Sequence, residues 1–165
     1  MFNSLKEYIR SVIQEEFART HNSKRLFNKF EDVPVSSQKV GGKPKGFWYG
    51  CDGSWERWAK QEMPKFLGKH NYKVQVDLSK MIVIRDYPQL IFFEKKYGVN
   101  VLDKVPGYED MVDVYIDWPR VVKEYSGIEI APYISKARER DWYFGWDVAS
   151  GCVWEKSALK SVEKV

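Results

Sequence analysis

Apolar residues in this chain come in short segments that glycine, proline and charged residues separate. Residues 72–78 alternate apolar and polar side chains, as a strand with one buried face does, and residues 81–84 form a fully apolar segment. No apolar run approaches the roughly 18 residues that cross a membrane. Short strands mixed with short helices predict an α+β chain with two small packed β-sheets.

Helical periodicity and capping residues predict an opening helix and several short helices between the strands. Leu5, Ile9 and Phe17 recur at helical spacing within residues 3–19, which indicates an amphipathic helix at the N-terminus. Asp117 is a good cap for a helix over 118–125. We also expect helices over 55–63, where Ser54 would cap the N-terminus, and over 88–97, and strands over 25–30, 46–50, 128–131 and 152–154.

The composition fits one domain with an ordinary core. The chain has 165 residues, 44% of them hydrophobic and 30% charged, and no internal repeat or shift in composition marks a second domain. The first seven residues contain no secretory hydrophobic region, so we expect a cytoplasmic protein that does not enter a membrane. Two Cys and two His are too few for a disulfide framework or a structural zinc site, so no metal site is expected.

Positive charge concentrates in one segment. Between Arg19 and Lys45 lie seven basic residues and only two acidic ones. Such a segment can meet the phosphates of a nucleotide or of a nucleic acid, or it can be a solvated loop.

Aromatic residues make up 16% of the chain and form two dense clusters, at residues 47–58 and 142–154. Trp48 and Tyr49 lie on the expected strand 46–50, and Trp58 lies on the helix that follows it. An aromatic strand that leads into a helix with another aromatic residue can hold a flat heteroaromatic ring, with added cation–π attraction if the ring is cationic. The alternative is that these residues belong to the core, which is also the interpretation we favour for the second cluster.

Glu129 lies in an otherwise apolar segment, Gly127-Ile128-Glu129-Ile130-Ala131. An ionised carboxylate is rarely buried without a partner. Glu129 is therefore expected either to face solvent by strand alternation or to project into a cleft. The chain has no P-loop, dinucleotide fingerprint, nucleophile elbow or zinc-binding helix, which argues against several common enzyme classes.

Together these features resemble the ADP-ribosyltransferase superfamily, the fold shared by diphtheria-type toxins and the poly-ADP-ribose polymerases. In that family a first strand offers a His or Arg to NAD, a second strand and the helix after it each supply an aromatic residue, and a late strand carries the catalytic Glu. Residues 46–49 look like the second strand, Trp58 lies ten residues after Trp48, and Glu129 is similar to the late Glu. Asn28 stands at the first-strand position. The resemblance covers roughly residues 25–133.

The resemblance implies an NAD-dependent ADP-ribosyltransferase of the size found among small toxins and phage or defence effectors. Glu129 would stabilise the oxocarbenium-like ribose that forms when the nicotinamide–ribose bond breaks. Trp48, Tyr49 and Trp58 would hold the nicotinamide, Asn28 would hydrogen-bond the ribose or amide, and basic residues between Lys24 and Lys45 would meet the pyrophosphate. The partners implied are NAD, a protein or nucleic-acid acceptor, and an inhibitor or antitoxin protein that covers the site.

Two other functions are compatible with the same residues. One is a non-enzymatic module that stacks single-stranded nucleic acid on exposed aromatic residues beside a basic loop. The other is a protein-interaction or inhibitor domain whose tryptophan-rich surface is the interface. The relative positions of Glu129 and Trp48 bear most directly on this choice, because the resemblance implies that both point into one cleft.

Overall fold

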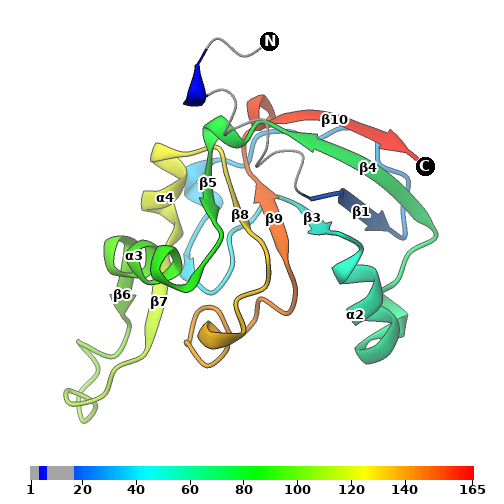
Figure 1. Cartoon of the computed structure of the whole chain (residues 1–165). Helices are drawn as coiled ribbons and strands as arrows, with labels where there is room; N and C mark the ends of the chain where they lie inside the picture. Colours follow the sequence, from blue (N-terminus) through cyan, green and yellow to red (C-terminus); the bar gives the residue numbers. More distant parts are fainter. Residues whose placement is uncertain (1–3, 7–16) are drawn as a thin grey trace.

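Two β-sheets of unequal size form the framework of the protein (Figure 1). The computed structural model describes residues 4–6 and 17–165, and within these the larger sheet has seven strands. In spatial order they are β10 (Leu159–Lys164), β4 (His70–Val76), β1 (Arg19–Ser23), β3 (Phe47–Cys51), β9 (Ser150–Val153), β8 (Gly127–Ile130) and β5 (Met81–Ile84). Only β5 and β8 pair in parallel. The smaller sheet consists of β2 (Val40–Gly41), β7 (Val114–Asp117) and β6 (Gly98–Asn100).

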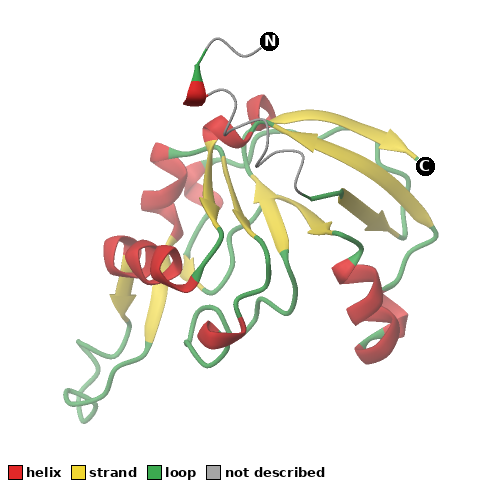
Figure 2. Cartoon of the chain, viewed as in Figure 1, coloured by secondary structure: helices red, strands yellow, loops and turns green. Residues whose placement is uncertain are grey.

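Within the part of the chain that the structure describes from residue 17 on, three α-helices flank the sheets (Figure 2). Helix α2 (Ser54–Glu62) follows β3, whereas α3 (Tyr87–Tyr97) and α4 (Trp118–Glu124) lie on the connection between β5 and β8. The side chain of Asp86 accepts a hydrogen bond from the backbone N–H of Gln89 and caps α3, and Asp117 caps α4 in the same way. Short 3₁₀ helices are η1 (Val35–Ser37), η2 (Pro64–Phe66), η3 (Leu78–Lys80), η4 (Ser135–Ala137) and η5 (Lys156–Ala158).

The α+β class, the two sheets and most of the expected elements agree with the sequence analysis, but one of the sheets is large and curled rather than small (Figure 1). The expected strand over 25–30 is loop, and the first strand is β1 instead. The expected helix over 3–19 falls mostly outside the described residues, and its last residue, Arg19, begins β1. Strand β10 was not expected, because its sequence alternates only weakly between apolar and polar residues.

The start of α2 also differs from the expectation. Gly53, with φ of 68°, precedes the first helical residue, and Ser54 is already helical. The Ser54 hydroxyl donates a hydrogen bond to the carbonyl of Ala149 at 2.8 Å instead of capping α2. This contact attaches the first turn of α2 to the chain that enters β9.

The large sheet separates two hydrophobic clusters. Ile128 and Cys152 face a cluster shared with α3, α4 and the segment 142–146. Tyr49 and Val153 face the other cluster, which β4 and β5 complete. Alternate residues of β3, β8 and β9 therefore point to different cores, as the period of two in a strand requires.

The tryptophans of the second aromatic cluster belong to the core, as the sequence indicated. Trp142, Trp146 and Trp154 are each at most 1% exposed. Each indole N–H has an acceptor: Glu94 for Trp142, the Gly42 carbonyl for Trp146 and the Tyr125 carbonyl for Trp154. Large apolar rings with satisfied polar atoms stabilise a core strongly.

Among the described residues, no helix is long and apolar enough to span a membrane.

Gly151 is required by the packing of Tyr49. A methyl group added at Gly151 would lie 2.2 Å from the Cζ and Oη atoms of the Tyr49 side chain. We therefore expect Gly151→Ala to lower the free energy of unfolding by about 1–3 kcal/mol, measured by urea denaturation. Gly41→Ala is the matched control, because nothing lies within 4 Å of its added methyl group. Equal stability of the two variants would contradict this account.

Candidate functional site

Strand pairing places Glu129 and Trp48 on opposite faces of the large sheet. Tyr49, Gly151 and Glu129 lie side by side in one row across β3, β9 and β8. Trp48 belongs to the next row, with Cys152 and Ile128. Neighbouring residues in a strand point to opposite faces, so the residues grouped into one site by the sequence analysis divide between two.

Glu129 is completely buried within a cage of hydrogen-bond donors. Its Oε2 accepts from Arg19 Nε at 2.6 Å and from the Tyr49 hydroxyl at 2.6 Å. Its Oε1 accepts from Arg19 Nη2 at 3.0 Å and from Arg85 Nη2 at 2.7 Å. The expectation that Glu129 faces solvent or a cleft is wrong, because its exposed fraction is 0% and both carboxylate oxygens are already paired with protein donors.

The cage keeps Glu129 ionised. Burial by itself would raise the pKa of the Glu129 carboxyl, but the hydrogen bonds and charge of Arg19, with Tyr49 and Arg85, outweigh it and hold that pKa below its ordinary value. Burial beside this carboxylate raises the pKa of the Tyr49 hydroxyl, which therefore stays protonated and remains a donor. The arrangement joins β1, β3 and β8 to the residue that follows β5 through one buried anion.

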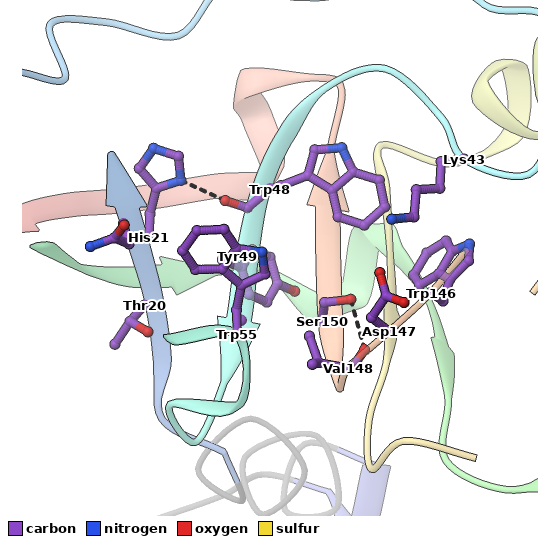
Figure 3. A pocket seen from close by; sticks show the side chains of 12 residues that line it. Thr20, His21, Lys43, Trp48, Tyr49, Trp55, Trp146, Asp147, Val148 and Ser150 are labelled. Carbon is purple, nitrogen blue, oxygen red and sulfur yellow. Dashed lines mark hydrogen bonds between the residues drawn. The ribbon is translucent and has the colours of Figure 1, made fainter. Parts of the chain in front are cut away.

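A pocket of about 290 Å³ lies between β1, β3, β9 and α2 (Figure 3). Three tryptophans contribute to its wall: Trp48 from β3, Trp55 from α2 and Trp146 from the loop before β9. Trp48 is half-buried, and its ring meets the ring of Trp146 edge to face at 5.1 Å between centroids. The polar residues of the wall are Thr20, His21, Asn22, Lys43, Asp147 and Ser150.

Comparisons with protein-family models, curated proteins and solved structures find no match for this chain.

His21 enters the pocket wall where β1 and β3 separate. The two strands pair only at Arg19 and Thr20, and beyond them the Nδ1 of His21 lies 2.6 Å from the carbonyl oxygen of Trp48. A carbonyl only accepts, so Nδ1 carries the proton and Nε2 is left as an acceptor. Burial lowers the pKa of His21, although the Trp48 carbonyl and the nearby Glu56 oppose this shift, so the imidazole is neutral at pH 7.

Of the predicted ligand-binding residues, only Trp48 presents its side chain to this pocket. Tyr49 contributes to the wall, but its hydroxyl points to Glu129 on the other face. Asn28 is exposed in the loop after β1, and Trp58 lies on α2 outside the set that lines the pocket. Within the described residues, no group of three or more His, Cys, Asp or Glu is placed to hold a metal ion.

The sequence did not point to His21 and Trp55 as pocket residues, for two different reasons. β1 reads Arg-Thr-His-Asn-Ser, which contains no apolar residue, so hydrophobic periodicity could not reveal the strand or His21. The ten-residue spacing that the resemblance implies selects Trp58, whereas the packing shows that Trp55 is the tryptophan of α2 that lines the pocket. A methyl group on Gly50 would lie 2.9 Å from the Cβ of Trp55, so this tryptophan rests directly on the β3 backbone.

Removing the charge of Glu129 should destabilise the fold. Glu129→Gln keeps the shape but leaves the guanidinium groups of Arg19 and Arg85 without their shared counter-ion, and we expect a loss of about 3–5 kcal/mol in the free energy of unfolding. Glu31→Gln is the control, because Glu31 pairs with Lys29 on the surface, where both side chains are at least 60% exposed. Similar stabilities for the two variants in chemical denaturation would show that the cage contributes no more than a surface pair.

The same substitution should alter the acid sensitivity of the fold. The folded-state pKa of Glu129 is depressed, so its stabilising contribution is complete above the unfolded-state pKa, near 4.3, and is lost as pH falls through the folded-state pKa. The difference in unfolding free energy between the wild type and Glu129→Gln should therefore narrow when the pH is lowered from 7 toward 3. A difference that stays constant over that range would contradict the depressed pKa.

Proposed function

We propose that the pocket between β1, β3 and α2 binds NAD through its planar nicotinamide ring. The observation that carries the proposal is that a first strand, a second strand and the following helix bring His21, Trp48 and Trp55 to one pocket. This is the kind and order of residues that the resemblance to ADP-ribosyltransferases implies. His21 takes the role expected of Asn28, and Trp55 takes the role expected of Trp58.

The reaction we propose is ADP-ribosyl transfer to a macromolecular acceptor, with Asp147 in place of Glu129 as the acting carboxylate. Breaking the nicotinamide–ribose bond develops positive charge on the ribose, which a nearby carboxylate stabilises. Glu129 is caged on the far face, whereas Asp147 lines the pocket beside Trp146. A protein or nucleic-acid acceptor would approach from the open side of the pocket.

Binding of a single-stranded nucleic acid is the second candidate, favoured by the half-buried ring of Trp48 with Lys43 beside it. A base stacked on Trp48 would place its phosphate near that ammonium. The basic segment between Arg19 and Lys45 supports nucleic-acid binding less strongly in the structure than in the sequence. Arg19 is buried against Glu129, and Lys43 is the only one of the seven basic residues that lines the pocket.

Calorimetric titration with NAD tests the binding step. Trp48→Ala should weaken NAD binding about tenfold or more, because stacking on one aromatic ring contributes roughly 1–3 kcal/mol. Trp58→Ala is the matched control and should bind NAD like the wild type, since Trp58 does not line the pocket. Equal losses in both variants would contradict the assignment of the pocket, and thermal melting verifies that each variant is folded.

Release of free nicotinamide from NAD tests the chemical step. Asp147→Asn should lower this release by about a hundredfold or more while NAD binding changes little, because a carboxylate acts mainly on the charged transition state. If the wild type binds NAD and releases no nicotinamide, the protein is a binding module and not a transferase. If a short single-stranded oligonucleotide binds in place of NAD, with affinity that falls steeply with salt, the second candidate is correct.

A further inference from the structure

The loop that carries Lys43 is held rigidly by buried side chains. The indole N–H of Trp118 donates to the Gly41 carbonyl at 3.0 Å, and that of Trp146 donates to the Gly42 carbonyl at 2.9 Å. On the other side of Lys43, the side chain of Gln38 both donates to the carbonyl and accepts from the N–H of Lys45, at 2.8 and 2.9 Å. Backbone that is fixed before a ligand arrives loses little entropy on binding.

The side chain of Lys43 extends from this loop into the pocket. Its ammonium lies 5.5 Å from the ring centroid of Trp48, in a cation–π contact. Its Cε passes 3.8 Å from the position of a methyl group built on Gly145, so the stem runs along the chain just before Trp146. Figure 3 shows the ammonium between the rings of Trp48 and Trp146, on the side of the pocket away from His21.

Lys43 is the one cation of the pocket wall as far as the described residues go, because His21 is neutral. No carboxylate among these residues lies within ion-pair distance of it. Burial lowers the pKa of Lys43, and the more distant charge of Asp147 only partly offsets this effect. Lys43 is an exposed residue, and its ammonium, which has no close counter-ion, gains from an anionic group on the ligand.

We propose that Lys43 is the anion-binding group of the pocket and that the ligand is a nucleotide whose phosphate meets this ammonium. The inference rests on the proposed function and specifies which part of the ligand each wall holds. Because the chain's own ammonium already occupies one face of Trp48, a cationic nicotinamide ring is repelled from that face. The ring therefore stacks on the other face of Trp48, on the side of Trp55, and the phosphate lies at the Lys43 side.

Two nucleoside–nucleotide pairs test this assignment: nicotinamide riboside against nicotinamide mononucleotide, and adenosine against AMP. In each pair we expect the phosphate to raise the affinity about tenfold or more at low salt, as a hydrogen bond to a charged group does. Lys43→Gln should abolish this gain and leave the affinity for the nucleosides unchanged or slightly higher. Lys45→Gln is the control, because Lys45 is, like Lys43, an exposed lysine of this segment, but it does not line the pocket.

The outcomes separate this inference from the proposed function. Equal affinities within both pairs, or a phosphate gain that survives in Lys43→Gln, would overturn the role of Lys43 even if NAD binds. A gain that depends on Lys43 for AMP, with no binding of either nicotinamide compound, would support Lys43 and reject NAD as the ligand. If no compound of either pair binds, both proposals are wrong.

Discussion

The buried carboxylate of Glu129 connects parts of the large sheet that are far apart in the sequence. Arg19 comes from β1, Tyr49 from β3, and Arg85 is the residue after β5. Arg19 donates to both carboxylate oxygens, Tyr49 to Oε2 and Arg85 to Oε1. Taking these charges out of water is costly, and the complete set of hydrogen bonds offsets that cost. The contact spans three strands, because Tyr49 of β3 reaches Glu129 of β8 across Gly151 of β9, where any larger side chain would meet the tyrosine ring.

The pocket is a consequence of the same packing. Since Tyr49 points to Glu129, its neighbour Trp48 must point to the opposite face, where Trp146 and Lys43 lie. Beyond Thr20 the strands β1 and β3 no longer pair, and residues of β1 form another wall of the pocket. The carbonyl of Trp48, which has no strand partner there, accepts a hydrogen bond from His21 instead. The strand that stabilises the fold on one face thus contributes an aromatic side chain to the pocket on the other.

The tryptophan-rich core also supports the pocket. Trp118 and Trp146 are buried, yet their indole N–H groups hold the backbone of the loop that carries Lys43. Rings with polar edges can therefore fix the backbone of β2 and of the surface segment that follows it. This explains how a chain with many aromatic residues uses them for both packing and positioning.

The sequence by itself determined the α+β class, helices α2, α3 and α4, strands β3, β4, β5, β8 and β9, and the core role of the second aromatic cluster, because apolar periodicity and caps act locally. It did not reveal β1, whose residues are all polar, nor the weakly patterned β10. Only the tertiary structure decided that Glu129 is an internal counter-ion and that His21, Lys43, Trp55 and Asp147 line one pocket with Trp48. Strand register and the pairing of distant charges set these positions, and neither leaves a periodic signal in the sequence.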